Sequence, residues 1–359
     1  MGRIRKFDFS SFSDRAWSSF SHDLGIDLGT SNTLVFVRGK GIVIREASMV
    51  ARQKRTKEFL AIGNSAKKML GKTPANIEAI KPLKEGVIAD FDACEAMLVK
   101  FIRQVHQSGR LIPMIPRPRV VIGIPSGVTE VERRAVQDVC LSAGARKAFL
   151  IEEPMAAAIG LGLPIERPEG MLIVDIGGGT TEIAVISLGG IVISKCIRIA
   201  SLKMDEAIAA YVRLRHSLLL GETTAEAVKL QVGSAYPLAR ERHLVVRGRG
   251  LEDGLPKSVK LSSTEIREAL SPVVRRIMDS LSQVLEETPP ELMADIVKKG
   301  ISLSGGGSLL DGIDKLITEE TKIPAWRSKN PMEAVVLGCG RALAEPSLLV
   351  KVKLSDGLR

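Results

Sequence analysis

The stretch that decides the fold is Asp175-Ile-Gly-Gly-Gly-Thr-Thr-Glu182, which joins the apolar runs 171–174 and 183–186. Two apolar runs joined by glycines predict a β-hairpin. The three glycines would let backbone N–H groups approach an anion that side chains would block, and the two threonines add hydroxyl donors. Asp175 ends the first run with a carboxylate that, beside phosphates, can reach a divalent cation through water. Taken alone, the stretch is also compatible with an ordinary glycine turn.

The same pattern occurs a second time, in Leu24 to Val37, where Asp27 ends an apolar run and a Gly-Thr-Ser-Asn turn leads into another. A third glycine cluster, residues 305–307, follows a further short apolar run. None of the three matches the G-x-x-x-x-G-K-[ST] loop or the G-x-G-x-x-G fingerprint, which disfavours a single-lobed nucleotide fold. Two phosphate hairpins about 150 residues apart predict two similar lobes that face each other across one polyphosphate.

These motifs resemble the phosphate, connecting and adenosine motifs of the superfamily of actin, heat-shock chaperones and sugar kinases. Within it, the chain is similar to the bacterial actin family of MreB and Mbl, from about residue 23 to about residue 343. The resemblance implies an α/β, actin-like bilobal fold, with two similar ribonuclease-H-like lobes around a nucleotide cleft and a small subdomain inserted in each. Further matching motifs are Gly39-Lys-Gly-Ile-Val43, Gly86-Val-Ile-Ala-Asp90, Val131-Glu-Arg-Arg-Ala135, Ile151-Glu-Glu-Pro-Met-Ala-Ala-Ala-Ile-Gly160, Ile186-Ser-Leu-Gly-Gly-Ile191 and Thr288-Pro-Pro-Glu-Leu292.

We expect five structural units. They are an amphipathic basic arm (1–21), a first lobe (22–50, 84–163 and 331–350), its small subdomain (51–83), a second lobe (164–200 and 264–330) and its small subdomain (201–263).

The resemblance implies that Mg-ATP binds between the lobes, with Mg²⁺ held through water by Asp27 and Asp175. It also assigns Glu226 and Lys229 to the ribose and base. From the residues alone, these two lie three apart on one helix face and are equally readable as a surface ion pair. The remaining expected nucleotide contacts are Gly29, Thr30, Ser31, Asn32, Gly177, Gly178, Gly179, Thr180, Gly305, Gly306 and Gly307.

Glu152 and Glu153 end an apolar run, and Pro154 suits the first position of a helix. A carboxylate at a helix N-terminus is kept charged by the helix dipole and can orient a water in line with a γ-phosphate, or simply cap the helix. By the resemblance, the water-positioning residue directly precedes the proline. We therefore expect Glu153, and after it Glu152, to be catalytic, with Thr180 near the same water.

One departure from the family lies close to the expected nucleotide. Where MreB proteins usually have Ala-Gly-Asp before Lys-Met-Asp, this chain has Ala200-Ser201-Leu202. The change replaces a glycine and an acidic residue by a hydroxyl and an apolar side chain. We expect it to alter nucleotide affinity or preference.

The composition points to a protein with a large core and an anionic partner. The 359 residues are 45% hydrophobic and carry a formal charge of +10, which favours anionic surfaces in general. Aromatic residues are only 4%, and no aromatic–basic platform or zinc-finger spacing predicts a sequence-specific nucleic-acid reader. No apolar run reaches the roughly 18 residues of a membrane span, and the start lacks a signal-peptide core. We expect a cytoplasmic protein on the inner face of the anionic plasma membrane, the alternative being a merely solvated basic surface.

The N-terminal arm sharpens the membrane prediction. On a helix, Phe9, Phe12, Ala16 and Phe20 share one face with Trp17 at its edge, after a basic cluster at residues 3–6. Cations followed by an aromatic stripe suit the lipid interface. Alternatively, the stripe packs on the folded body, or the arm is disordered. A second apolar segment contains Leu111 and Ile112, and by the resemblance a loop at this place inserts into the membrane.

The function that the resemblance implies is a slow ATPase that polymerises into antiparallel double filaments. Such filaments organise wall synthesis and rod shape together with membrane cell-shape proteins and wall-synthesis enzymes. The alternatives are a non-polymerising or division-linked actin homologue, a small-molecule kinase and a chaperone ATPase. The kinase would need a catalytic Asp, which is not evident between residues 126 and 157, and the chaperone a client-binding domain, for which no length remains after about residue 343.

Overall fold

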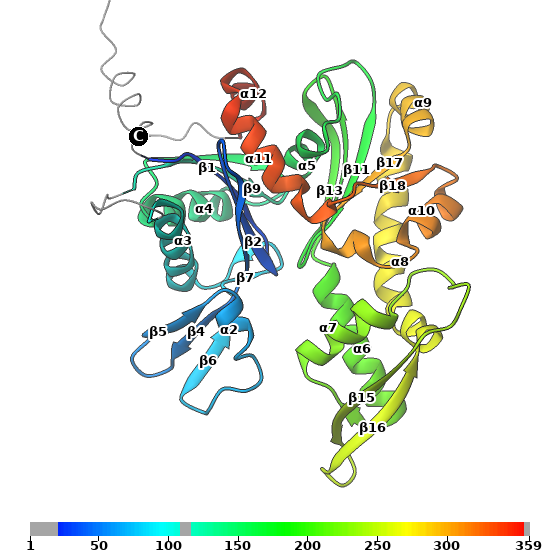
Figure 1. Cartoon of the computed structure of the whole chain (residues 1–359). Coiled ribbons are helices and arrows are strands. Elements are labelled where there is room, and N and C mark those ends of the chain that lie inside the picture. The colour runs from blue at the N-terminus through cyan, green and yellow to red at the C-terminus, as the bar shows by residue number, and fades with distance from the viewer. Residues whose placement is uncertain (1–20, 108–115, 355–359) are drawn as a thin grey trace, which may run out of the picture.

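A computed structural model describes residues 21–107 and 116–354, which form two lobes side by side (Figure 1). The predicted membrane residues Phe9, Phe12, Trp17, Phe20, Leu111 and Ile112 lie outside the described residues. Among the described helices, none is long and apolar enough to cross a bilayer.

The first lobe is a five-stranded sheet with the order β10-β9-β1-β2-β3. β1, β2 and β3 are antiparallel neighbours, whereas β9 and β10 run parallel to β1. Val120 and Ile122 pack toward helices α3 and α4, and Val121 between them packs on the opposite face, because strand residues alternate between faces. The elements are β1 (Leu24–Leu28), β2 (Asn32–Val37), β3 (Gly41–Ala47), β9 (Arg119–Ile124), β10 (Lys147–Glu152), α3 (Phe91–His106) and α4 (Glu130–Ser142).

The second lobe repeats this sheet with the order β13-β12-β11-β17-β18 and the same strand directions. Even a register shift recurs, between Val35 and Phe36 in β2 and between Val185 and Ile186 in β12. The predicted pair of similar lobes in an actin-like fold is confirmed. Its elements are β11 (Met171–Ile176), β12 (Thr181–Ser187), β13 (Gly190–Ile197), β17 (Ile301–Ser304), β18 (Ala325–Arg327), α8 (Ser263–Glu287), α9 (Pro290–Lys299), α10 (Ile313–Thr321) and the 3₁₀ turns η1 (Gly306–Leu309) and η2 (Pro331–Glu333).

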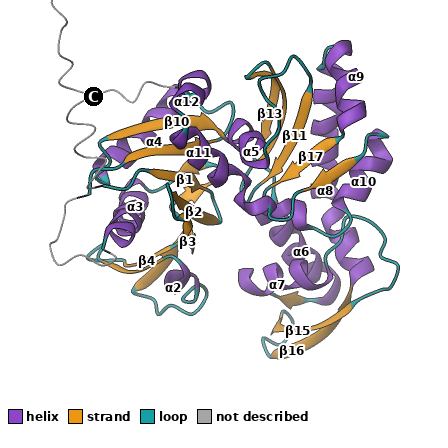
Figure 2. Cartoon of the chain, turned by 45° about the horizontal axis from the view of Figure 1, so that its top comes forward, coloured by secondary structure: helices purple, strands orange, loops and turns teal. Residues whose placement is uncertain are grey.

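Two crossing helices, α5 (Glu153–Leu161) and α11 (Ala334–Ala344), join the lobes (Figure 2). A Cβ on Gly160 would lie 1.8 Å from the carbonyl oxygen of Ala334, and one on Gly338 would lie 1.8 Å from that of Ala156. Only glycine allows backbones to come this close. The two helices share a buried core with both sheets and with α12 (Pro346–Val352), so the lobes are connected by a packed pivot.

Each lobe carries a smaller unit below its sheet (Figure 1). In the first, β5, β4 and β6 form a three-stranded sheet, in which Ile62 of β5 pairs with Val50 of β4. In the second, α6 and α7 pack beside the sheet β14-β15-β16. The elements are β4 (Val50–Gln53), β5 (Phe59–Ile62), α2 (Asn64–Lys67), β6 (Ile77–Ile80), β7 (Leu83–Lys84), β8 (Val87–Ile88), α6 (Ser201–His216), β14 (Leu218–Leu219), α7 (Glu222–Val232), β15 (His243–Gly250) and β16 (Pro256–Ser262).

Candidate functional site

The two predicted phosphate hairpins face each other between the lobes. The turn between β1 and β2 contacts the turn between β11 and β12 so closely that a Cβ on Gly178 would lie 2.3 Å from the Ser31 hydroxyl oxygen. A Cβ on Gly179 would lie 2.6 Å from the Thr30 hydroxyl oxygen, which also accepts a hydrogen bond from the Gly86 N–H at 3.1 Å. The glycines therefore leave backbone donors and hydroxyls of both lobes around one small space.

That space is a cavity of about 360 Å³ between the lobes. All the residues predicted for nucleotide, metal and catalysis line it except Glu152, so the fold brings together segments from Asp27 to Gly307. Gly305 and Gly307 pack against the end of β11, where a Cβ would lie 2.3 Å from atoms of Ile176. The three glycine clusters thus meet at one site.

Three apolar side chains in the same cavity did not stand out in the sequence. Leu230, Leu309 and Met332 are 71%, 43% and 40% exposed, and all three line the cavity. Exposed apolar side chains beside a polar glycine cradle suit a flat aromatic ring next to phosphates. They come from three separate elements, so no local pattern marks them.

Carboxylates gather at the bottom of the cavity. Asp175 is buried, and Asp27 is half-buried where it faces the cavity. Loss of water contact raises the pKa of Asp27 to about 8, helped by the nearby charge of Asp175, and raises the pKa of Asp175 to about 6. Oδ1 of Asp175 has no hydrogen-bond partner among the described residues. A buried, unpartnered carboxylate oxygen beside a second carboxylate fits a cation.

The described residues contain no cluster of three or more His, Cys, Asp or Glu side chains placed to hold a metal ion. The two aspartates are therefore too few for a site built from side chains alone. They do fit Mg²⁺, which keeps several waters and is usually held by one or two carboxylates together with phosphates.

Glu153 and Glu152 have different surroundings. Glu153 is the first residue of α5 and lines the cavity. Its pKa is raised well above the usual value, first by burial and then by the charges of Glu182, Asp27 and Asp175. Glu152 is the N-cap residue, its side chain makes no capping hydrogen bond, and it does not line the cavity. The geometry thus favours Glu153 over Glu152 as the carboxylate that faces a ligand.

A carboxylate missed by the sequence analysis joins the two lobes. Glu182 of β12 is 0% exposed, and its Oε2 accepts hydrogen bonds from the N–H and the hydroxyl of Ser126 in the first lobe, both at 2.9 Å. Burial raises the pKa of Glu182 to about 8, although the Ser126 N–H opposes the shift. The only signal in the sequence is a charged residue inside an otherwise apolar strand.

Lys229 and Glu226 do not pair with each other. Lys229 Nζ lies 2.8 Å from Asp205 and donates to the Ser201 hydroxyl at 2.6 Å. Glu226 instead forms an ion pair of 2.9 Å with Lys67 of the first lobe's small subdomain. Both residues line the cavity. The alternative that Glu226 and Lys229 form an ion pair with each other on the surface is therefore wrong. Ser201 and Leu202 line the cavity too, which places the departure from the family pattern at the site itself.

Two lobes with one sheet order, joined by crossing helices around a cavity with paired glycine hairpins, are the architecture of an actin-like protein. The family model described as "MreB/Mbl protein" matches residues 21–351. The chain belongs to this family and is a bacterial actin homologue.

Individual relatives agree with this assignment. The cell shape-determining protein MreB of Escherichia coli strain K12 is 52% identical over 328 residues, which are 90% of this chain and 94% of that protein. The cell shape-determining protein Mbl of Bacillus subtilis strain 168 is 46% identical over 94% of this chain and its own full length. MreB5 of Spiroplasma citri, solved with ADP and with AMPPNP, has a TM-score of 0.85 and 37% identity over 92% of this chain and 97–98% of that one.

Proposed function

We propose that this chain binds Mg-ATP between its lobes and polymerises with it into filaments. The observation that carries this proposal is the direct contact of the two glycine hairpins, which places backbone and hydroxyl groups of both lobes around the cavity of about 360 Å³. It is supported by the S. citri MreB5 structures with ADP and AMPPNP, which share the fold at 37% identity. A ligand held from both sides stabilises one relative arrangement of the lobes, and therefore one surface for the next subunit.

In this proposal the glycine hairpins and the apolar end of the cavity bind different parts of the nucleotide. Thr30, Ser31 and residues 177–180 bind the phosphates through backbone N–H groups and hydroxyls, and the apolar end takes the base. Asp27 and Asp175 would hold Mg²⁺ through its waters, and the ion would supply positive charge that stabilises the phosphates.

Hydrolysis is assigned to Glu153 with Thr180. Burial and the neighbouring carboxylates raise the pKa of Glu153, and a carboxylate with a raised pKa binds a proton more strongly than an ordinary one. Glu153 would orient the attacking water and accept its proton, and Thr180, at the turn where the Gly177 N–H donates to its carbonyl oxygen, would hold the same water. In this proposal ATP hydrolysis is slow. Its role is to weaken the filament after assembly rather than to supply a metabolic product.

The cellular role follows from family membership together with the sequence. We propose antiparallel double filaments in the cytoplasm, peripheral on the inner face of the anionic plasma membrane. Residues 1–21 and the apolar segment with Leu111 and Ile112 would contact lipid. Membrane cell-shape proteins and wall-synthesis enzymes would be the partners through which the filament maintains a rod shape.

Sedimentation combined with electron microscopy tests this proposal. The purified chain is compared without nucleotide, with Mg-ATP and with Mg-AMPPNP, each with and without anionic vesicles. Filaments that need nucleotide and lie on the vesicles are expected. A monomer under every condition would contradict the polymerisation proposal, and filaments in solution that ignore vesicles would contradict the membrane proposal alone.

A further inference from the structure

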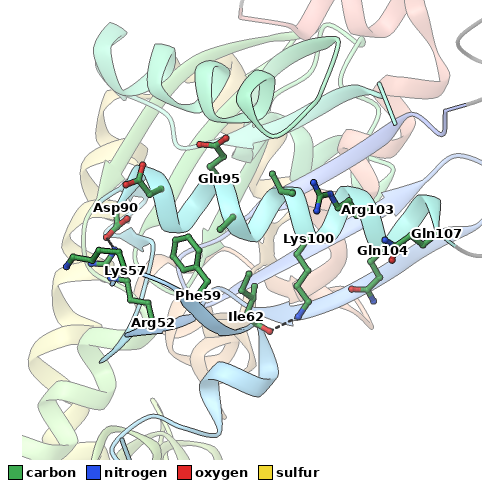
Figure 3. A pocket seen from close by; sticks show the side chains of 13 residues that line it. Arg52, Lys57, Phe59, Ile62, Asp90, Glu95, Lys100, Arg103, Gln104 and Gln107 are labelled. Carbon is green, nitrogen blue, oxygen red and sulfur yellow. Dashed lines mark hydrogen bonds and ion pairs between the residues drawn. The ribbon is translucent and has the colours of Figure 1, made fainter. Parts of the chain in front are cut away.

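A groove of about 900 Å³ runs between helix α3 and strand β5, and shares none of its lining residues with the cavity between the lobes (Figure 3). Its apolar part is formed by Phe59 and Ile62 from the strand and by Ala96 and Val99 from the helix. All four side chains are half-buried, and three of them also pack on the core of the first lobe. An apolar, half-covered strip of this kind suits a peptide with apolar side chains on one face.

The charges around the groove are unequally distributed. Arg52 forms ion pairs with Glu78 and Asp90, both with a nitrogen–oxygen distance of 2.7 Å. Lys100 Nζ donates a hydrogen bond to the Ile62 carbonyl oxygen at 2.8 Å. At the start of α3, Asp92 and Glu95 have no ion-pair partner among the described residues. At the other end of the same helix, Arg103 is exposed. Figure 3 shows Glu95 and Arg103 at separate places along α3, and Lys57 lies with Arg52 near Asp90 at the end where the helix begins.

Ser21, the first described residue, lies beside the last turn of α3, where Arg103 and Gln107 line the groove. The Ser21 hydroxyl lies 3.2 Å from His106 Nε2, and the His22 N–H donates to the same nitrogen at 3.0 Å. The Arg117 N–H donates to the Ser21 hydroxyl at 3.1 Å. His106 is the last residue of α3, so the chain outside the described residues joins the body at this end of the helix.

The arm matches the groove in length, apolarity and charge. Its aromatic stripe, Phe9 to Phe20, would span about 18 Å as a helix, against about 24 Å for the 16 residues of α3. A helix that runs back from Ser21 along α3 would bring Arg5, after about 24 Å, to the first turn of α3, which contains Asp92. Its cations at residues 3–6 then meet the unpaired carboxylates of Asp92 and Glu95.

We propose that residues 1–20 dock in the groove between α3 and β5 of their own chain, with the aromatic stripe on Val99 and Phe59 and the basic cluster at Asp92 and Glu95. The same stripe cannot face the groove and lipid at once. Docking therefore competes with vesicle binding, and this consequence alone rests on the proposed membrane role. The docking itself requires neither lipid nor nucleotide.

Tryptophan fluorescence tests the docking directly, because Trp17 and Trp326 are the two tryptophans of the chain. In the W326F chain, Trp17 is expected to emit as a partly buried indole without lipid, and dilution should not change this emission. Val99→Asp should shift the emission to longer wavelength. Leu214→Asp, at a side chain 81% exposed on α6, is the matched control and should not.

Three results would overturn the proposal. Trp17 could already emit at the wavelength of exposed indole, V99D could leave the emission unchanged, or dilution could shift it, which would assign the groove to a second copy. Because V99D alters a half-buried side chain, a charge reversal provides an independent test. Glu95→Lys should shift the emission and Arg5→Glu should restore it in the double variant, and failure to restore it contradicts the docked orientation.

The competition is measured with vesicles of anionic phospholipid. If the arm is docked nine-tenths of the time, blocking the groove with V99D should tighten vesicle binding by up to about tenfold. Unchanged vesicle binding together with the emission shift would contradict competition while leaving docking intact. Absence of vesicle binding in every variant would contradict the membrane role and not the docking.

Discussion

The two lobes share one sheet order and the same strand directions, yet their hairpins carry different residues at one equivalent position. In the first lobe Asp27 pairs with Leu34, and in the second Asp175 pairs with Glu182. Leu34 lines the cavity, whereas Glu182 binds Ser126 of the other lobe. The repeated scaffold therefore places one glycine hairpin on each side of the cavity, while at this position only the second hairpin carries a carboxylate that binds the other lobe.

The largest effect is expected for Glu153→Ala. If this carboxylate orients the water, its loss should slow ATP hydrolysis by about 10²–10⁴-fold, the usual contribution of a general base. Nucleotide affinity should change little, which separates catalysis from binding. Glu152→Ala is the matched control, since Glu152 lies one residue away and outside the cavity. Equal turnover by the E153A and unmodified proteins would remove Glu153 from the mechanism.

The substitution Glu182→Leu removes this difference between the lobes, because it gives the second hairpin the residue that the first has at Leu34. The change leaves the buried N–H of Ser126 unpaired, so the free energy of unfolding should fall by about 1–3 kcal/mol. Ser126→Ala removes only the hydroxyl donor and should cost about 0.5–1.5 kcal/mol. Urea unfolding measures both, and equal losses would contradict a special role for the backbone contact.

The difference in the free energy of unfolding between the unmodified protein and the Glu182→Leu variant should depend on pH. The raised pKa of Glu182, about 8, means that the folded state holds a proton that the unfolded state has already released above pH 4.5. Glu182 thus lowers stability as pH rises from about 4.5 to 8. The loss caused by Glu182→Leu should therefore be greatest near pH 5 and should shrink toward pH 8. A loss that grows with pH would contradict the burial of this carboxyl group.

A smaller effect is expected where the two hairpins touch. Gly178→Ala places a Cβ 2.3 Å from the Ser31 hydroxyl oxygen, so nucleotide affinity should fall about tenfold, equivalent to about 1.4 kcal/mol. Ser31→Gly in the same chain should restore part of it. Gly190→Ala, where the nearest atom would be 3.9 Å away, is the control. Calorimetric titration measures the affinities, and a lack of rescue would mean that the clash is not the cause.

The smallest effect concerns the departure from the family. Ser201→Gly removes one hydrogen bond from Lys229, which keeps Asp205 as its partner. Nucleotide affinity should rise by a few-fold because the ammonium group is freer to reach the ligand. Adding Leu202→Asp restores the usual family pair and should change the affinity further. Identical affinities in all three proteins would show that this loop does not tune binding.

Local patterns predicted much of the fold. The hairpins were readable because strand, glycine turn and strand are contiguous, and Pro154 marked the start of α5. The assigned roles of the site residues stay predictions. The Ser126–Glu182 contact was not readable, since its partners are 56 residues apart and belong to different lobes. The Lys67–Glu226 pair, 159 residues apart, depends in the same way on how the small subdomains are placed.

The crossing of α5 and α11 has a consequence for mutational tolerance. No side chain larger than hydrogen fits at Gly160 or Gly338, since a Cβ at either would penetrate the neighbouring backbone. In a saturation scan of viability, both positions should be as intolerant as Gly178, although neither lines the cavity. A scan of viability alone would therefore not distinguish glycines that are needed for the helix crossing from glycines that are needed at the cavity. A readout that separates folding from binding is needed to tell them apart.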